Sequence, residues 1–312
     1  MTLPAEFLDR LSYIIPESVW NNVVDSFNTE KQTCFRINSF LTSVDNVANW
    51  LKQQAIPYTF YDHPYPGFFA INPAYRTQLT HSDLAVQRHI YIQNPSSMVP
   101  VTALDPQPEE HILDLAAAPG SKTTLISELM NNTGRLAAVE KAKSRFHHLN
   151  ANLKEHGCKQ VKTYLKDGRR VGHLCPAWFD KVLLDTPCSS ESRFRSNQPS
   201  TYRYWNLKKI KAMQHKQFCL LESAVKALKP GGTLIYSTCT FAPEENECNI
   251  HRLLNHYPEL TVKPIELMNL PVLPSLTHWG EFDFATDITN TVRLYPNQLF
   301  DGFFIAKLIK AI

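Results

Sequence analysis

The sequence predicts an α/β protein whose main domain is a parallel, doubly wound sheet, preceded by a small α+β domain. From about residue 85 onward, short apolar runs alternate with amphipathic helical segments, the order typical of a parallel sheet with helices on both faces. The earlier part is irregular and contains several prolines. The 312 residues also exceed what one ordinary domain needs, so we expect two domains, over residues 1–84 and 85–312.

Within the first domain, the pattern predicts a helix from Leu3 to Phe27 and a strand from Thr33 to Asn38. A second helix is expected from Val44 to Gln54. Prolines at four positions (57, 64, 66 and 73) interrupt the chain after this helix, so turns are expected there.

The second domain is predicted from its repeated strands and helices. The expected strands are His111–Leu115, Arg135–Val139, Val161–Tyr164, Phe179–Leu184 and Thr233–Tyr236. The expected helices are Lys122–Met130, Ala142–Glu155, Leu207–Leu228 and a segment from about 244 to 256. Two extended runs near the end, 291–295 and 302–309, are expected to pair as an antiparallel edge of the same sheet.

Composition narrows the class of protein. The chain is 43% hydrophobic with a formal net charge of only +3, so overall charge says little about a partner. Its seven cysteines include no CxxC pair, which argues against a zinc site and against a disulfide scaffold. Free thiols fit a reducing compartment. No signal peptide or membrane span is evident, so we expect a soluble, cytoplasmic, metal-free monomer.

A turn between the first predicted strand and helix has the character of a nucleotide-cofactor site. It consists of the run Ala116, Ala117, Ala118, Pro119, Gly120, Ser121 and Lys122. Small residues let the backbone approach a ligand closely, and Pro-Gly favours a tight turn. Ser121 is expected to cap the following helix, whose N-terminus favours an anionic group.

Several interpretations of this turn compete. A Walker A loop would need glycine directly before the lysine, and a dinucleotide turn would need GxGxxG; neither is present. An ordinary strand–helix loop is the simplest alternative. However, Glu140 ends the second strand 20 residues after Gly120, a spacing suited to binding ribose hydroxyls. Asp167 and Asp185 follow the next two strands and add acids to the same edge of the sheet.

Two cysteines stand at the ends of core strands, on the edge where such sheets bind ligands. Cys188 follows Asp185-Thr186-Pro187, and Cys239 follows Tyr236-Ser237-Thr238. A free cysteine is usually a small buried hydrophobe, which is the interpretation given to the other five. At a ligand-binding edge, a thiolate can instead be exposed and activated.

Such a thiolate suggests a specific reaction. Attack at C6 of a pyrimidine makes C5 nucleophilic, and C5 can then accept a methyl group from a sulfonium donor. An acid such as Asp185 suits the developing charge at the ring nitrogen. The second cysteine can assist loss of the C5 proton and release of the product.

Several motifs resemble the Sun-type RNA cytosine-C5 methyltransferases, most closely the bacterial members that act on 16S ribosomal RNA. The matching segments are Arg36–Ser39, Tyr91–Met98, Ala116–Thr123, Asp185–Ser189, Ser237–Glu247 and Asp301–Ala306. The resemblance implies a Rossmann-like sheet that binds S-adenosylmethionine, with an N-terminal RNA-recognition domain before the catalytic domain. The nearest enzyme alternative is a DNA cytosine-C5 methyltransferase, which uses the Pro-Cys cysteine as nucleophile.

The resemblance also implies residue roles. Ala116 to Lys122 would wrap S-adenosylmethionine, Glu140 would hold its ribose and Asp167 its adenine end. Asp185 would lie near the methyl donor and the base. Cys239 would be the nucleophile, and Cys188 would help release the product.

Two positions depart from the family pattern Asp-Ala-Pro-Cys-Ser-Gly. Thr186 replaces the alanine and Ser190 replaces the glycine, which makes the loop after Cys188 bulkier and stiffer. These departures are the only support for a third alternative, a non-catalytic RNA-binding protein on a degenerate methyltransferase scaffold. Among catalytic alternatives, ribosomal RNA is the expected substrate and transfer RNA the second choice.

The segment from 192 to 221 is the expected RNA contact. It contains no Asp or Glu, and aromatic residues alternate with its basic ones. The basic residues are Arg193, Arg195, Arg203, Lys208, Lys209, Lys211 and Lys216. Basic side chains bind phosphates and aromatic rings stack on unpaired bases, and the segment directly follows Cys188.

Overall fold

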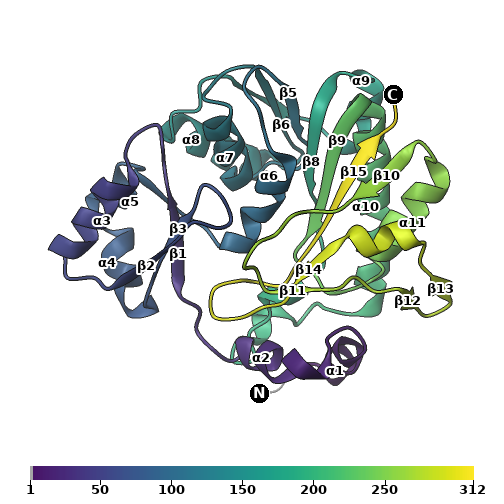
Figure 1. Cartoon of the computed structure of the whole chain (residues 1–312), viewed down its shortest axis with the longest axis horizontal. Helices are drawn as coiled ribbons and strands as arrows, with labels where there is room; N and C mark the ends of the chain where they lie inside the picture. The colour runs from purple at the N-terminus through teal and green to yellow at the C-terminus, as the bar shows by residue number, and fades with distance from the viewer. Residues whose placement is uncertain (1–2) are drawn as a thin grey trace.

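A small antiparallel sheet forms the N-terminal part of the molecule. The computed structural model describes residues 3–312. The sheet has the order β2-β3-β1-β4, with β1 (Thr33–Ile37), β2 (Tyr58–Tyr61), β3 (Phe68–Ile71) and β4 (Ile90–Ile92). Helices α3 (Val44–Gln53), α4 (Arg76–Thr80) and α5 (Asp83–Val86) lie against it (Figure 1). The expected division between residues 84 and 85 falls inside α5, and β4 comes after it, so the small sheet uses chain on both sides of that division.

The segment from residue 3 to residue 27 forms two helices rather than the single one expected. Helix α1 (Ala5–Ser12) and helix α2 (Glu17–Ser26) are separated by a turn that ends at Pro16. Proline disfavours helical backbone in the residue before it and lacks a donor N–H, which explains the break. Both helices lie apart from the small sheet, below the long central strands (Figure 1).

The central sheet confirms the predicted doubly wound α/β class. Its order is β11-β14-β15-β9-β8-β5-β6-β7, with β10 also paired to β15. The parallel strands are β5 (His111–Asp114), β6 (Arg135–Glu140), β7 (Val161–Leu165), β8 (Phe179–Asp185) and β9 (Leu228–Thr238). The antiparallel ones are β10 (Leu260–Lys263), β11 (Val272–Leu273), β14 (Val292–Leu294) and β15 (Phe303–Lys310). The expected antiparallel edge is therefore confirmed, with β15 pairing against β9.

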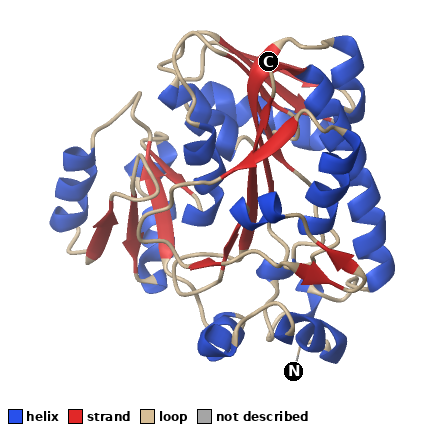
Figure 2. Ribbon diagram, turned by 45° about the vertical axis from the view of Figure 1, so that its right-hand side comes forward, coloured by secondary structure: helices blue, strands red, loops and turns tan. Residues whose placement is uncertain are grey.

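Helices cover both faces of this sheet (Figure 2). One face packs against α6 (Val99–Leu104), α7 (Ser121–Leu129) and α8 (Lys143–Glu155). The other packs against α9 (Val171–Leu174), α10 (Leu207–Ala227) and α11 (Glu247–His256). A separate hairpin joins β12 (His278–Trp279) to β13 (Phe282–Asp283). None of the helices within residues 3–312 is long and apolar enough to cross a membrane.

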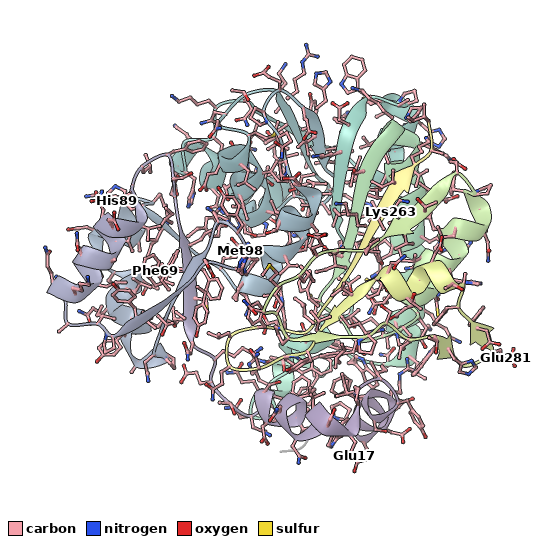
Figure 3. The ribbon with its side chains drawn as sticks, in the orientation of Figure 1. Glu17, Phe69, His89, Met98, Lys263 and Glu281 are labelled. Carbon is pink, nitrogen blue, oxygen red and sulfur yellow. The ribbon has the colours of Figure 1, made fainter. Side chains whose placement is uncertain are left out.

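The two sheets share one hydrophobic core. Met98, which Figure 3 labels between them, is fully buried in a cluster that joins Phe68 of the small sheet to Ile112 and Ile235 of the central sheet. Phe69, the next residue of β3, faces the opposite way, into the cluster beneath α3. Successive strand residues point to opposite faces, so β3 is buried on both sides and fixed between α3 and the central sheet.

A buried arginine ties the small sheet to helix α7 of the central sheet. Arg36 of β1 has no exposed surface and forms an ion pair with Glu128 of α7. It also donates to Thr124 Oγ1 at 2.7 Å and to Gln93 Oε1 at 3.1 Å. The other carboxylate oxygen of Glu128 accepts from the Ser39 amide at 3.1 Å. Every partner of this charge is inside the protein, so its position is fixed.

We predict that Arg36→Ala lowers the free energy of unfolding by about 3–5 kcal/mol, because Glu128 is left as an unpaired buried carboxylate. The matched control is Arg88→Ala. Arg88 pairs with Glu155 of α8, but these side chains are 42% and 44% exposed, so its loss is expected to cost under about 1 kcal/mol. Urea unfolding of both variants measures the difference. Equal losses would contradict the assignment of Arg36 as a buried anchor.

Candidate active site

The two predicted strand-end cysteines lie side by side. Strands β8 and β9 are parallel neighbours in which Asp185 lies opposite Ser237, so the loops that follow leave the sheet together. The Cys188 and Cys239 Sγ atoms are 3.3 Å apart. Both side chains are half-buried. The sequence placed these thiols on one edge of the sheet, and the structure places them in direct contact.

A buried carboxylate joins the two cysteine-bearing loops. Glu191, which is 2% exposed, comes from the loop after Cys188. It accepts hydrogen bonds from Thr240 Oγ1 at 2.7 Å and the Phe241 amide at 2.9 Å, both from the loop after Cys239. Trp205 Nε1 donates to its other oxygen at 2.7 Å. Burial raises the pKa of Glu191, while these three donors act in the opposite direction.

A second buried acid holds the first loop from behind. Glu245 accepts from the Ser189 amide at 3.0 Å and from Gln217 Nε2 at 2.6 Å. Gln217 belongs to α10, and the same amide nitrogen donates to the Pro187 carbonyl at 3.0 Å. Burial raises the pKa of Glu245 to about 7. The Pro-Cys-Ser turn is thus tied at both ends to α10.

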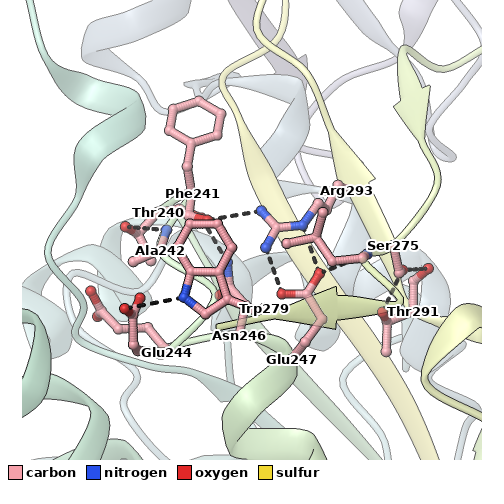
Figure 4. A network of polar contacts seen from close by, with 12 residues as sticks. Thr240, Phe241, Ala242, Glu244, Asn246, Glu247, Ser275, Trp279, Thr291 and Arg293 are labelled. Atoms are coloured by element: carbon pink, nitrogen blue, oxygen red, sulfur yellow. Dashed lines mark hydrogen bonds and ion pairs between the residues drawn. The ribbon is translucent and has the colours of Figure 1, made fainter. Parts of the chain in front are cut away.

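The rest of the Pro-Glu-Glu-Asn-Glu segment ties this site to distant parts of the chain (Figure 4). Glu244 forms a two-oxygen ion pair with Arg10 of α1, at 2.8 and 2.7 Å. Asn246 accepts from Thr238 Oγ1 at 2.6 Å. Glu247 accepts two hydrogen bonds from Arg293 of β14, from Nε at 2.7 Å and from Nη2 at 2.5 Å. This ion pair is almost fully buried. The sequence matched this motif to a family without indicating what each residue does.

Helices α1 and α2 pack against the same loops. The ring of Phe7 lies 5.0 Å from that of Phe194, and the ring of Phe27 lies 6.2 Å from that of Phe241, centre to centre. Phe194 follows Cys188 by six residues and Phe241 follows Cys239 by two. All four rings are buried in one cluster, so the first two helices support the cysteine loops from below.

The pKa values of the two thiols are shifted in opposite directions. The hydrogen bond from Cys188 lowers the pKa of Cys239, and the charge of Arg193 acts in the same direction against burial. The same bond, together with burial, raises the pKa of Cys188 well above the ordinary value. Either sulfur can be the donor in the observed contact, and the two pKa directions favour Cys239 as the thiol that ionises first.

A cavity of about 380 Å³ opens beside the thiols, within the size range of small-molecule sites. The predicted turn forms its wall, through Ala116, Ala117, Ala118, Pro119, Ser121 and Lys122. Gly120, at the bend, has φ +109° and is the N-cap of α7. The expectation that Ser121 caps this helix is wrong, because Ser121 is already its first helical residue and no side chain caps it.

Lys122 and Asp185 face the cavity as an ion pair. Lys122 Nζ lies 2.5 Å from Asp185 Oδ2, and Ser237 donates to Asp185 Oδ1 at 2.9 Å. Lys122 also lies over the ring of Phe303, 5.6 Å from its centre. Its ammonium group is therefore aimed at the end of β8 rather than at solvent.

Two of the predicted acids lie on the same sheet edge but outside the lining of this cavity. Glu140 is buried, accepts from the Ala142 amide at 2.7 Å and lies 3.5 Å from Arg145. Asp167 pairs with Lys141 at 2.8 Å and Arg169 at 2.6 Å, and the Arg169 bond holds the Asp167 pKa well below its usual range. Their ribose and adenine roles remain predictions.

The cavity also includes residues that the sequence argument did not assign to it. Asp114, at the end of β5, accepts from Thr123 Oγ1 at 2.7 Å, and burial raises its pKa to about 6. Its place at a strand end was a signal that could have identified it. Ser97 and Phe303 lie in two of the segments that matched the family, Tyr91–Met98 and Asp301–Ala306, but the match assigned them no role. Arg193, predicted as an RNA contact, lines the cavity beside both thiols.

Comparisons with known proteins agree with this site. A family model described as 16S rRNA methyltransferase RsmB/F matches residues 101–309. A Pectobacterium carotovorum protein named ribosomal RNA small subunit methyltransferase F is 35% identical, over 99% of this chain and 63% of its own length. A Vibrio vulnificus (strain YJ016) protein of the same name is 34% identical, over 99% and 64%. The chain thus spans slightly under two thirds of these relatives.

Solved structures give the class of fold. A methyltransferase homolog from Pyrococcus horikoshii matches with a TM-score of 0.80 and 30% identity, over 99% of this chain and 100% of that one. NSun6 from Pyrococcus horikoshii has a TM-score of 0.84 at 22% identity, over 99% and 98%. The fold is that of the Rossmann-like S-adenosylmethionine-dependent methyltransferases, as the resemblance implied. More narrowly, the chain belongs to the 16S rRNA methyltransferase RsmB/F family.

The thiol pair gives a pH prediction. Alkylation of Cys239 by iodoacetamide is expected to follow a midpoint below the ordinary thiol value of 9.0. In Cys188→Ala the midpoint rises, because the thiolate loses its main hydrogen-bond donor. Peptide mass spectrometry across pH measures both, with Cys34, whose pKa burial raises to about 12, as an internal reference that stays unmodified. An unchanged midpoint in Cys188→Ala would contradict the assigned direction of the hydrogen bond.

Proposed function

We propose that this protein is an S-adenosylmethionine-dependent RNA cytosine-C5 methyltransferase, with small-subunit ribosomal RNA as its substrate. One observation carries the proposal: two thiols 3.3 Å apart, with opposite pKa directions, beside a ligand-sized cavity at the sheet edge. Membership of the RsmB/F family and the names of the relatives support the choice of RNA. Its seven free thiols suit a reducing compartment, so we place its action in the cytoplasm. We also propose that it acts as a monomer.

The cavity residues fit S-adenosylmethionine. The alanine run at the wall presents backbone without bulky side chains, and the carboxylates of Asp114 and Asp185 face the same space as counterions for a positively charged ligand. When bound, this cofactor supplies an electrophilic methyl group on a sulfonium sulfur. Glu140, at the adjoining strand end, is proposed to hold the ribose and Asp167 the adenine.

Cys239 begins the reaction. Its thiolate bonds to C6 of the cytosine, and the electrons of the C5–C6 double bond move into the ring. The Lys122 ammonium group donates to Asp185, and this pair can supply the proton that the ring nitrogen takes as this charge develops. C5 thereby becomes the nucleophile that takes the methyl group.

Cys188 completes the reaction. Its pKa is raised chiefly because it donates to the Cys239 thiolate, and that cause disappears once Cys239 is bonded to C6. Cys188 can then lose its proton to solvent and accept the proton from C5. The C5–H electrons restore the double bond and expel Cys239 as thiolate, while the ring nitrogen returns its proton. The balance is one methyl group gained by the base and one proton released.

A second cavity supplies a path for the RNA. It measures about 1050 Å³ and shares Ser97, Pro119, Ser121 and Arg193 with the first. Its walls come from the small sheet, the segment after α2 and the loop after Cys188. Four cations (Lys31, Arg76, Arg193 and Arg195) and two acids (Glu30 and Asp301) line it, and Asp301 pairs with Lys31 and Arg195. A strand bound there can place one unstacked base against the thiols.

The test of activity uses the purified protein with labelled S-adenosylmethionine and unmodified cellular RNA, separated by size and digested to nucleosides. We expect label in 5-methylcytidine from the small-subunit ribosomal RNA. Label only in the transfer RNA fraction would retain the chemistry and overturn the substrate. Cofactor binding without label in any fraction, assembled subunits included, would favour the non-catalytic scaffold.

In the same assay, Cys239→Ala is expected to abolish transfer, since no thiolate remains to attack C6. Cys188→Ala is expected to accumulate a covalent protein–RNA adduct, visible as a shifted band under denaturing conditions, because the C5 proton has no acceptor. Cys219→Ala serves as the control, because this half-buried thiol of α10 lines neither of the two cavities. Full activity in Cys239→Ala would contradict the mechanism.

The RNA path predicts a salt-dependent effect. Arg76 is exposed in the second cavity, so Arg76→Ala is expected to weaken RNA binding several-fold and to reduce the salt slope of binding by about one. Lys263→Ala is the matched control, because this cation is also exposed, lies on β10 (Figure 3) and does not line the cavity. Filter binding at several salt concentrations measures both. Equal effects of the two variants would rule out the assigned path.

A further inference from the structure

Ser190 occupies an unusual position in the site. Its backbone lies in the left-handed region, with φ 60° and ψ 35°, a conformation that costs a residue with a Cβ roughly 1 kcal/mol or more and that glycine adopts freely. The family pattern places glycine at this position. A serine held there is a reason to ask what its side chain does.

The hydroxyl of Ser190 lies within hydrogen-bond reach of both sulfurs. Its Oγ accepts from the Cys239 thiol at 3.6 Å, lies 3.8 Å from Cys188 Sγ, and donates to the Cys188 carbonyl at a long 3.4 Å. Once a thiol loses its proton it can only accept, so the Ser190 hydroxyl is the group left to donate to it. Because bonds to an ionised acceptor are about twice as strong as neutral ones, the hydroxyl proton turns to whichever sulfur is the thiolate.

We propose that the Ser190 hydroxyl is a hydrogen-bond donor shared by the two thiols, stabilising the negative charge first on Cys239 and then on Cys188. The second half rests on the proposed function, in which Cys188 becomes the base after Cys239 has bonded to the substrate. Ser190 is a positioning residue in this scheme, since it acts through the sulfurs.

Other charges also act on this pair. Arg193 favours the Cys239 thiolate, Asp185 opposes it, and Glu245 disfavours ionisation of Cys188. Asp114, Lys122 and Arg145 line the remainder of the cavity. The test therefore changes only the hydroxyl and leaves all of these charges in place.

The experiment compares Ser190→Ala with Ser190→Gly, by alkylation of Cys239 across pH in the absence of RNA and cofactor. Alanine keeps the Cβ and the left-handed strain, whereas glycine relieves it, so a shared effect reports the lost hydroxyl. Both variants are expected to raise the midpoint by about one pH unit and to slow alkylation at neutral pH about tenfold. Ser192→Ala is the control, since that hydroxyl donates to the Cys239 carbonyl at 2.9 Å rather than to sulfur, and its midpoint stays in place.

A midpoint unchanged in both variants, or raised in Ser190→Ala alone, would overturn the proposal. The proposed bond from Ser190 to the Cys188 thiolate is tested by alkylating Cys188 across pH in Cys239→Ala and in the double variant that also carries Ser190→Ala. If the midpoint for Cys188 is the same in both proteins, Ser190 does not serve both thiols. Because no RNA or methyl donor is present, the outcome is separate from that of the activity test. A raised midpoint in a protein that methylates no RNA would leave the Ser190 assignment standing and remove the proposed function.

Discussion

The site depends on one constraint, the fixed separation of two loops that leave neighbouring parallel strands. Strand pairing alone brings the ends of β8 and β9 to the same edge, at the usual interstrand spacing of about 4.8 Å. Beyond the strands, the buried carboxylate of Glu191 binds the second loop from the first. Ser189 and Ser192 of the first loop add hydrogen bonds to Thr240 Oγ1 and to the Cys239 carbonyl. Glu245 fixes the first loop to α10. The contact between the sulfurs follows from these bonds.

The N-terminal part of the chain contributes to the same constraint in two separate ways. Helices α1 and α2 place aromatic rings beneath both cysteine loops, and Arg10 pairs with Glu244 beside them. The small sheet, by contrast, is anchored through Arg36 to α7, the helix that begins at the cofactor turn. The segment proposed to recognise RNA is therefore in physical contact with both the cofactor wall and the thiol loops. Substrate binding and the geometry of the chemistry share one framework.

Much of this could be predicted from the sequence because the signals are local. Apolar strands alternating with helices indicated the doubly wound sheet, and strand ends indicated the common edge for Cys188, Cys239 and Asp185. What sequence could not supply was the tertiary pairing of buried charges. Nothing local in Glu191 shows that it binds Thr240. The break of the first helix is a different case, because Pro16 was a local signal that the sequence analysis missed. Ser190 was noted as a departure from the family, but only the structure placed its hydroxyl within reach of both sulfurs.

The mechanism assigns the nucleophile to Cys239 although Cys188 lies against it. RNA containing 5-fluorocytidine tests this assignment directly. Fluorine at C5 cannot leave as a proton does, so the thiol is not eliminated. The enzyme therefore remains covalently bound to the RNA after methyl transfer. The trapped complex is digested and its modified peptide identified by mass spectrometry. We expect a methylated fluorocytidine adduct on the peptide that carries Cys239. An adduct on the Cys188 peptide would reverse the assigned roles and contradict the mechanism.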